Sequence, residues 1–405
     1  MAAAADRASR SYDVVLFGAT GFTGGLTADY LAAHAPAGLR WALAGRSQAK
    51  LEAVRDRLTG IDPTLADLPL LVADASDESR LAEVAAQTKV VATTVGPYLQ
   101  HGGPLVAACA AAGTDYVDLT GEPEFVDKMY VAHNATAEAS GARIVHACGF
   151  DSIPHDLGAY YTIKALADEL GGEITEPVRM RGVVRAGAGF SGGTFHSAMT
   201  AFSRAKHMRD AMQARRRIET RPEGRRSRAI AGKPGRDREL GYWLLPMPTI
   251  DPAVVARSGA ALSAYGPDFG YSHFAGTKTL HFAAGGAAGV SALAVAAQVP
   301  PVRNLLLKRV PQGSGPSEAR REKSWFTVDF VASTEPSAGE PVTVRTRVSG
   351  GDPGYTETAK MIAESALCLA LDDLPESAGQ VTTATAMGDA LLARLIDAGI
   401  CFERR

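Results

Sequence analysis

The chain has 405 residues, with 42 Lys and Arg, 44 Asp and Glu, and a formal net charge of −2. This length allows two or three domains with a sizeable core, and the balanced charge excludes a global attraction to nucleic acid. The first residues carry charges and no long apolar run, so we expect a cytoplasmic protein without a signal peptide.

The cysteines lie far apart, with no CxxC pair and no metal-ligand spacing. Such spacing indicates neither a disulfide framework nor a metal centre. We therefore predict no bound metal, and buried thiols in a reducing compartment, at Cys109, Cys148, Cys368 and Cys401.

Short apolar strands alternate with helical segments over residues 1–150. Strands that alternate with helices form right-handed crossovers and a parallel sheet. The sequence therefore predicts an α/β fold whose first domain, 1–150, is a Rossmann-type doubly wound parallel sheet. The expected strands are 12–18, 39–46, 68–76, 90–95, 114–122 and 142–150.

Glycines cluster in "GATGFTG", residues 18–24, between the first strand and the first helix. Glycine allows a tight turn and a close approach to a ligand, and amides at a helix N-terminus favour phosphate. The spacing is GxxGxxG instead of GxGxxG, but its place between strand and helix favours a dinucleotide pyrophosphate over a plain turn. The predicted contacts are Gly18, Ala19, Thr20, Gly21, Phe22, Thr23 and Gly24.

The end of the second strand indicates which dinucleotide binds. NAD-specific domains place Asp or Glu there, whereas this chain has Arg46 and Ser47, with Lys50 one helical turn later. An arginine and a hydroxyl suit an anionic 2′-phosphate, which a carboxylate would repel. We predict NADP(H); the alternative is that these are ordinary solvated charges.

Two later loops complete the predicted cofactor groove. Asp74, after the third strand, is expected at the adenine end, and Val95, Gly96 and Pro97, after the fourth, near the nicotinamide ribose. The alternatives are a helix cap at Asp74 and a plain turn at Gly96–Pro97.

Period-two alternation appears in the second half, at 178–186, 325–333 and 341–349. This pattern is typical of half-exposed antiparallel strands. We predict a second, α+β domain over 151–353 that holds the substrate. A C-terminal helical segment is expected over 354–405, and one possible arrangement is that it packs back on the first domain.

Three segments of the second domain have unusual composition. Residues 204–238 carry 13 Lys or Arg against four acids, and we expect a solvated loop, with docking of an acidic carrier protein or an anionic membrane as the alternative. Residues 282–302 lack charge but are mostly Ala and Gly, which favours a packed helix or a shallow lipid-facing surface over a membrane span. In "FSGGTFHSAM", 190–199, either an anion-binding amide nest or an N-cap by Ser191 or Thr194 is expected.

Several stretches resemble the saccharopine dehydrogenase-like oxidoreductase family: "GATGFTG", "LAGRS", "TTVGPYLQHGGPLVAACAAAGTDYVDLTGE" and "HACGFDSIPHDLGAY". Within it, and through "AMGDALLARLIDAGI" at 386–400, the chain is most similar to the actinobacterial trans-acting enoyl reductases. The resemblance implies an NADPH-dependent enoyl reductase of lipid or glycolipid biosynthesis. Its substrate would be an acyl thioester on the acyl carrier protein of a polyketide synthase, and peripheral contact with the plasma membrane would be in keeping with such a substrate. The oligomeric state is left open.

Enoyl reduction requires a donor for the thioester oxygen and a proton for the α-carbon. Tyr98 and the turn "GFDSIPHD" follow strands at the carboxyl edge of the sheet. We expect Tyr98 to be the donor or acid, His155 to be the alternative acid, and Asp151 to orient the loop. The alternatives are that Tyr98 only walls the cofactor and that Asp151 only caps a turn.

Other functions are compatible with the sequence. Tyr160 and Lys164 match the YxxxK pair of short-chain reductases of ketones, although they follow the sixth strand and not the fifth, and we treat the match as coincidence. A saccharopine dehydrogenase-like reductase of an imine and a non-catalytic NADP-binding scaffold are the remaining alternatives.

Overall fold

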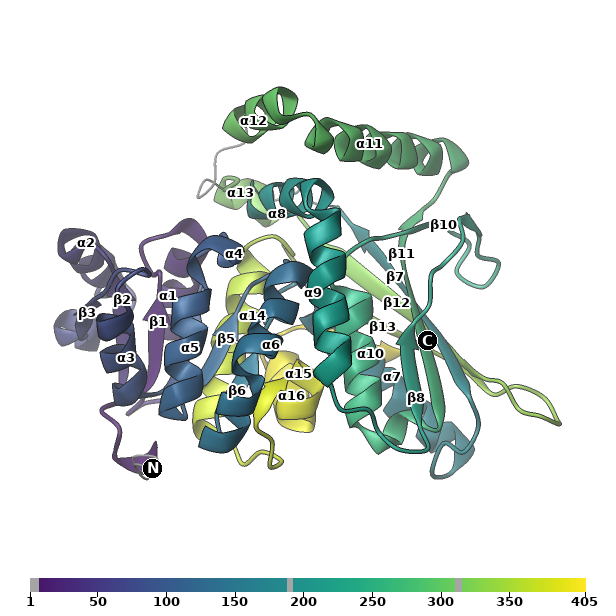
Figure 1. Cartoon of the computed structure of the whole chain (residues 1–405), viewed down its shortest axis with the longest axis horizontal. Coiled ribbons are helices and arrows are strands. Elements are labelled where there is room, and N and C mark those ends of the chain that lie inside the picture. The colour runs from purple at the N-terminus through teal and green to yellow at the C-terminus, as the bar shows by residue number, and fades with distance from the viewer. Residues whose placement is uncertain (1–6, 188–191, 310–314) are drawn as a thin grey trace.

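The computed structural model describes residues 7–187, 192–309 and 315–405. Two sheets lie side by side in Figure 1, with the N-terminal one on the left and the other on the right. Helices cover both, and helices α11 (Leu280–Gln298) and α12 (Pro300–Arg309) stand outside them at the top.

The first sheet has seven parallel strands in the order β14-β6-β5-β4-β1-β2-β3. Leaving β14 aside, this is the 3-2-1-4-5-6 order of a Rossmann domain, so the predicted parallel doubly wound sheet is confirmed. The strands are β1 (Tyr12–Phe17), β2 (Trp41–Gly45), β3 (Leu70–Val72), β4 (Thr88–Thr93), β5 (Asp115–Asp118), β6 (Arg143–Val145) and β14 (Gly379–Val381).

Both faces of this sheet are buried, because alternate residues of each strand point to opposite sides. Val14 and Leu16 pack on the side of α1 and α14, while Val15 and Phe17 pack on the side of α3, α5 and α6. The helices of this layer are α1 (Phe22–His34), α2 (Gln48–Leu58), α3 (Glu78–Gln87), α4 (Tyr98–His101), α5 (Gly103–Ala112), α6 (Pro123–Ser140) and α14 (Thr356–Leu371).

The second sheet is mixed and has β7 (Val178–Ala186) at its centre. β12 (Phe326–Thr334) pairs with β7 antiparallel, and β11 (Asp268–Thr277) pairs with it parallel. The predicted α+β fold with antiparallel strands is therefore confirmed. The other strands are β8 (Arg226–Ala229), β9 (Gly235–Arg236), β10 (Trp243–Pro246), β13 (Thr343–Gly350) and β15 (Cys401–Arg404).

Further helices cover the second sheet and join it to the first. α7 (Ile153–Leu170) packs on β12 and β13, and beside it lies α10 (Asp251–Ala261). The remaining ones are α8 (Gly192–Ser203), α9 (Ala205–Ile218), α13 (Glu318–Arg321), α15 (Thr383–Ala386) and α16 (Gly388–Asp397), with 3₁₀ turns η1 (Arg7–Ser9), η2 (Pro63–Asp67) and η3 (Ser263–Tyr265).

The end of the chain crosses back between the two sheets. α14 lies against α1 and the first sheet, β14 pairs in parallel with β6, and β15 pairs with β13 of the second sheet. Residues 354–405 thus contain two strands besides the helices. Strands of three and four residues carry too little periodicity to be seen in the sequence.

The expectation of a solvated loop over 204–238 is wrong for its first part. α9 is a helix that packs on α6, and the side chain of Arg215 is buried there between Asp127 and Glu219, over the ring of Tyr130. Ion pairs and an aromatic face compensate the burial of this guanidinium. Ser191, offered above as an N-cap, lies outside the described residues.

Of the two arrangements expected for 282–302, a packed helix or a shallow lipid-facing surface, the structure does not show the packed helix. Only 11% of the apolar window of α11 is buried, although the helix is long and apolar enough to cross a membrane. The four cysteines are free thiols; three are buried as expected, but Cys401 on β15 is exposed.

The carboxylate of Asp156 joins three segments of the chain. It lies on α7 and accepts hydrogen bonds from Ser258 Oγ of α10 (2.5 Å), Thr383 Oγ1 (2.7 Å) and the amide of Ala384 (2.9 Å), the last two on α15. Asp156 is fully buried, and this burial raises its pKa to about 6, against the hydrogen bonds, which lower it.

We predict that Asp156→Asn lowers the free energy of unfolding at pH 7 by about 1–3 kcal/mol, because an amide nitrogen replaces an acceptor that buried donors need. A carboxyl whose pKa is raised by folding stabilises the folded state below its unfolded pKa of ~3.9, and this contribution is lost as the pH rises through about 6. The difference between parent and variant should therefore narrow from pH 4 to pH 7. Urea unfolding at both pH values measures it.

Asp168→Asn, on the exposed end of the same helix, is the matched control and should change stability little. A stability difference for Asp156→Asn that is absent, or that widens with pH, would contradict the role given to this carboxylate.

Candidate active site

The glycine-rich turn between β1 and α1 is closely packed. Gly18 has φ 97°, and a Cβ on it would lie 2.6 Å from Val95 Cγ2. A Cβ on Gly24 would lie 2.1 Å from the carbonyl oxygen of Gly18, which also accepts hydrogen bonds from the amide of Gly21 and from Thr94 Oγ1. These positions therefore require glycine, and α1 begins directly against the end of β1.

The N-terminus of α1 is open to an anion. Its N-cap residue, Gly21, is extended and makes no side-chain cap bond, so no side chain of the cap covers the first amides of the helix. Open amides at the positive end of a helix fit a pyrophosphate. The predicted contacts from Gly18 to Gly24 all lie in this turn and the first turn of the helix.

Three hydrogen-bond donors, Arg46, Ser47 and Lys50, lie at the end of β2 and the start of α2. Arg46 and Lys50 are exposed, and within the described chain neither has an ion pair. Ser47 is the N-cap of α2, and its hydroxyl makes no cap hydrogen bond. Two cations without an ion pair and a hydroxyl without a cap hydrogen bond fit the 2′-phosphate of NADP.

Asp74 turns its carboxylate into its own loop. Oδ1 accepts hydrogen bonds from the amide (2.9 Å) and the hydroxyl (2.6 Å) of Ser76, and these bonds, with a smaller contribution from Arg46, lower its pKa. The N-cap of α3 is Asp77. Asp74 is thus a turn residue near Arg46, and its contact with adenine stays a prediction.

The loop after β4 lies beside the glycine-rich turn, as the close approach of Val95 to Gly18 shows. Gly96 is exposed and precedes Pro97 through a cis peptide bond. Thr93 Oγ1 accepts a hydrogen bond from the amide of Val95. The structure thus brings the two loops together at the carboxyl edge of the sheet, where dinucleotides bind in this fold.

The hydroxyl of Tyr98 does not point toward a ligand. It donates to the carbonyl oxygen of Thr93 and accepts from the amide of Leu119, each at 3.1 Å, and the side chain is buried beside Phe125. Burial raises the pKa of this phenol well above its usual value. The phenol ties two loops together, so the structure does not support Tyr98 as the donor to the substrate.

A buried cluster surrounds His155. Its Nδ1 lies 3.2 Å from Asp251 Oδ1, and Nε2 of His273 lies 3.7 Å from Asp251 Oδ2. Burial lowers the pKa of both imidazoles, that of His273 to about 3, so both are neutral near pH 7. The ligand atoms of these three residues lie within 4.8 Å of one another, a spacing that suits a hydrogen-bonded triad or a cation, and the absence of a metal stays a prediction.

Asp251 and His273 are functional candidates that the sequence did not reveal. They come from α10 and β11, about a hundred residues after His155. Ser152 Oγ also donates to Asp251 Oδ1 at 3.2 Å, and Ser152 has φ 117°, a conformation that strains a non-glycine residue. No local sequence pattern indicates the contacts of Asp251 and His273 with His155, because they form only when distant parts of the chain fold together.

Asp151 is half-buried and lies at the carboxyl edge of the first sheet. Its Oδ2 is 3.0 Å from the position of a Cβ on Gly121, in the loop after β5. Burial and, secondarily, the negative charge of Asp251 raise the pKa of Asp151. For Asp251, burial is outweighed by His155 and His273 together with the hydrogen bonds from Thr249 and Ser152, and these keep its pKa below the usual value. One carboxyl is thus held toward the acid form and the other ionised.

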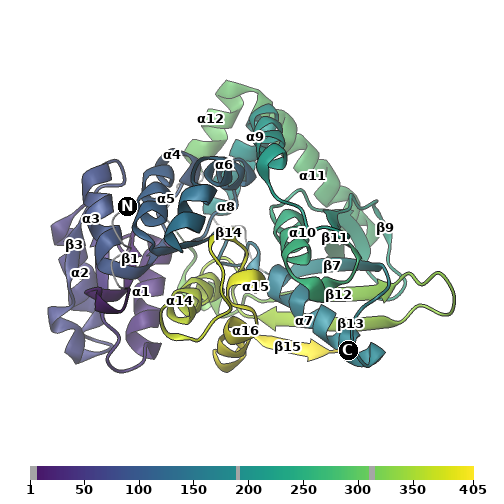
Figure 2. The ribbon, with the colours of Figure 1, turned by 60° about the horizontal axis from the view of Figure 1, so that its bottom comes forward.

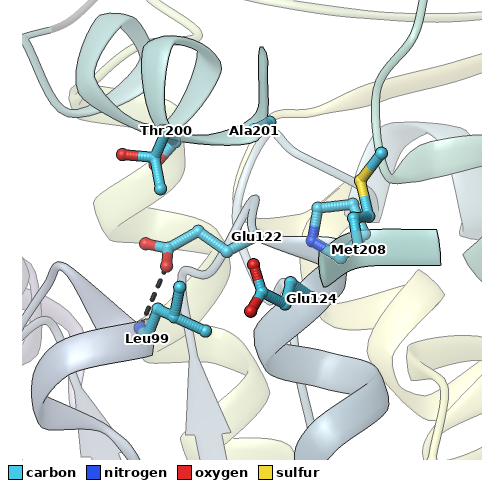
Figure 3. A pocket seen from close by; sticks show the side chains of 8 residues that line it. Leu99, Glu122, Glu124, Thr200, Ala201 and Met208 are labelled. Atoms are coloured by element: carbon cyan, nitrogen blue, oxygen red, sulfur yellow. Dashed lines mark hydrogen bonds between the residues drawn. The ribbon is translucent and has the colours of Figure 1, made fainter. Parts of the chain in front are cut away.

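Next to these loops is a small cavity, shown in Figure 3. The carboxylate of Glu122 accepts from the amides of Tyr98 and Leu99, capping α4, and burial raises its pKa. The volume of about 10 Å³ holds roughly one water, so an acyl chain would need more room. Its lining is Leu99, Glu122, Pro123, Glu124, Ser197, Thr200, Ala201 and Met208.

Tyr160 and Lys164 lie away from the cofactor loops. Lys164 Nζ forms an ion pair with Asp389 Oδ1 of α16 at 2.5 Å. Burial, and then the charge of Asp389, raise the pKa of Tyr160 to about 12, whereas the short-chain mechanism needs a lowered pKa. The match to YxxxK is therefore a coincidence of helical spacing.

Residues 14–145 match the saccharopine dehydrogenase NADP binding domain family. A Mycobacterium tuberculosis protein and a Mycobacterium ulcerans protein, both named trans-acting enoyl reductase, are 39% and 38% identical to this chain, each over 97% of both chains. The chain belongs to the saccharopine dehydrogenase-like family, in its trans-acting enoyl reductase branch. It is an NADP-dependent oxidoreductase, and the predicted cofactor is confirmed.

A solved structure supports the fold of this family member over its whole length. Saccharopine dehydrogenase (L-Glu forming) from Saccharomyces cerevisiae superposes with a TM-score of 0.55, covering 97% of this chain and 99% of that one, at 13% identity. At this identity the likeness shows the fold alone.

We predict that Arg46→Ala raises the Kd for NADPH about 10- to 100-fold and changes that for NADH little. The reason is that a charge-assisted contact to the 2′-phosphate contributes ~1.5–3 kcal/mol. Fluorescence titration of the purified protein with both nucleotides measures the two constants.

The control is Arg80→Ala, which removes an exposed arginine that pairs with Glu83 on α3. It should bind both nucleotides as the parent does. Equal losses of NADPH and NADH affinity in Arg46→Ala would contradict the 2′-phosphate assignment.

Proposed function

We propose that this oxidoreductase is a trans-acting enoyl reductase, which transfers a hydride from NADPH to the β-carbon of an α,β-unsaturated acyl thioester. The similarity to relatives with this name carries the proposal, because it extends over 97% of the chain and so includes the second domain as well as the cofactor domain. The cofactor loops fit NADP independently of those names.

The bound NADPH supplies the hydride, and the chain has to hold the nicotinamide and the acyl group in line. The loop 94–97 and the turn 18–24 would hold the dinucleotide, while the loop 119–122 and Asp151 border the space beyond the strands. Negative charge develops on the thioester oxygen as the β-carbon is reduced, so a donor or a proton must be supplied there and at the α-carbon.

Asp151 is the proton donor in this proposal. Of the three candidates, Tyr98 has its hydroxyl bonded to backbone and His155 is a buried neutral imidazole, whereas Asp151 is partly accessible. Its raised pKa keeps the carboxyl protonated to higher pH than an ordinary aspartic acid, which is what a general acid requires. His155 and Asp251 then position the loop that carries it.

The acyl group is proposed to arrive on the acyl carrier protein of a polyketide synthase in lipid or glycolipid biosynthesis. A "trans-acting" reductase must receive its substrate from another protein. Exposed basic residues on α9, Lys206, Arg209, Arg216 and Arg217, offer a surface to an acidic carrier.

The test of this function is NADPH oxidation by the purified protein with an enoyl thioester, free and carried on an acyl carrier protein. Turnover with the enoyl substrate, and none with an imine or a ketone, is expected. Oxidation with an imine or ketone alone would overturn the assignment. If the protein binds NADPH but does not oxidise it with an enoyl thioester, an imine or a ketone, it is a non-catalytic scaffold.

We predict that Asp151→Asn lowers kcat about 100-fold or more, the usual range for loss of a general acid, with the Kd for NADPH unchanged. In the parent, turnover should fall as the pH rises through the raised pKa of Asp151, because only the protonated carboxyl donates. This alkaline decline should disappear in the variant. Rate profiles against pH measure both.

Asp389→Asn is the control, since this carboxylate is 62% exposed and pairs with Lys164 away from the cofactor loops. It should keep the parent rate and profile. If Asp151→Asn also keeps them, the proton comes from another group.

A further inference from the structure

Helices α11 and α12, Leu280–Arg309, form an arm outside the two sheets. Figures 1 and 2 both show the arm along one edge of the molecule, where α11 contacts α8, β10 and β11. Among the described residues of the arm only Ala283 and Ala297 are buried. The side chain of Gln298 donates to the carbonyl oxygen of Phe202, which joins the arm to α8.

The arm exposes large apolar side chains. It carries seven of the fifteen large hydrophobic residues that are exposed in the described chain, including Phe282 and Val295, each 67% exposed. Contiguous exposed apolar surface on a folded protein marks a contact with a protein or a membrane. The seven are Leu280, Phe282, Val290, Val295, Val299, Val302 and Leu305.

The charge around the arm has one sign. Residues 269–317 contain no Asp or Glu, and residues 279–302 contain no Lys or Arg either. Lys278 stands before the apolar stretch, and Arg303, Lys308 and Arg309 stand after it. An uncharged centre between basic ends is complementary to a surface that is apolar inside and anionic at its edge.

We propose that the arm is a membrane-docking element that lies in the interface of a bilayer with anionic headgroups. The apolar side chains enter the acyl region, and the flanking cations contact the lipid phosphates.

The topology of the second sheet excludes a membrane-spanning arrangement. α11 has 19 residues and a length of about 28 Å, enough to cross the hydrocarbon core. The strands on either side of the arm, β11 and β12, both pair with β7 over most of its length. Both ends of the arm therefore stay on the same side of the bilayer, and the arm lies along the surface.

The distribution of the apolar residues favours lipid over a second protein. At 100° per residue, Leu280, Phe282, Val290 and Val295 spread over roughly 220° of the circumference of α11. One packed helix covers a stripe of about 100°, whereas a fluid interface can contact every apolar side chain that the helix does not turn toward the protein. An acidic protein would match the cations but leave the apolar centre in water.

Part of the chain that follows the arm, from Gly315 onward, contacts the glycine-rich turn. Gly315 lies so close to Phe22 of the glycine-rich turn that a Cβ would be 2.2 Å from the ring, and the guanidinium of Arg321 lies 5.7 Å from the centre of the same ring. Docking would thus place the cofactor site near the membrane surface. That an acyl substrate uses this nearness rests on the proposed function; the docking itself does not.

The test is co-sedimentation of the full chain with vesicles of phosphatidylcholine, with and without phosphatidylglycerol. The parent should bind the anionic vesicles. The double variant Phe282→Asp, Val295→Asp should lose at least tenfold in partitioning. Ile61→Asp, Ile396→Asp is the matched control, because it adds the same charge at apolar residues that are 43% and 45% exposed elsewhere, and it should bind as the parent.

Lys308→Gln, Arg309→Gln should weaken binding to the anionic vesicles and reduce its salt dependence. NADPH affinity and turnover in solution should be unchanged in every variant, which separates this proposal from the proposed function. Equal binding by parent and Phe282→Asp, Val295→Asp would overturn the proposal. A parent protein that binds no vesicle would also overturn it. If that parent forms a dimer, and Phe282→Asp, Val295→Asp dissociates the dimer, the arm binds a second copy of the chain and not a membrane.

Discussion

One fully buried carboxylate, that of Asp156, holds α7, α10 and α15 together. Asp156 accepts hydrogen bonds from α10 and α15, and Ser258 also lies 2.6 Å from Thr382 Oγ1, so segments more than a hundred residues apart meet at one point. Burial makes each of these bonds costly to break without a replacement. They fix the start of α7, which carries His155 and follows the loop of Asp151. The geometry of the candidate site is thus a consequence of how the C-terminal part of the chain returns.

Local signals account for the part of the fold that the sequence predicts well. The turn from β1 to α1 needs glycine because Gly18 and Gly24 touch neighbouring backbone and side chains, and that need appears directly as a motif. The role of Arg46 and Ser47 is predicted from their sequence separation from this motif, which places them at the end of the second strand. By contrast, β14 and β15 are held by pairing with β6 and β13, and their own residues give no sign of it.

The candidate site could be predicted only in part, for the same reason. Tyr98 stands at the expected edge of the sheet, but the phenol can turn either to a ligand or to backbone, and only packing against Phe125 and the loop of Leu119 decides between them. The environment of His155 comes from Asp251 and His273, which no spacing connects to it. The many basic residues of α9 likewise suggested a solvated loop. The sequence does not reveal that Asp127, on a distant helix, forms a buried ion pair with Arg215.

An acyl chain needs more room beside these loops than the structure shows. Two sets of contacts could open to give that room, and they differ in the free energy needed to break them. Between the sheets, α7 and α14 belong to one hydrophobic core that runs from Val14 to Phe330, so separating the sheets would expose a large apolar area. On the other side, α8 and α9 adjoin the first sheet through ion pairs such as Arg204 with Glu124, whose arginine is 34% exposed. Partly exposed ion pairs are exchanged for water at small cost. The cavity beside Glu122 lies on this second side. The buried Arg215 anchors α9 to α6, whereas α8 lines the cavity with Ser197, Thr200 and Ala201, so movement of α8 enlarges the cavity at less cost than movement of the sheets.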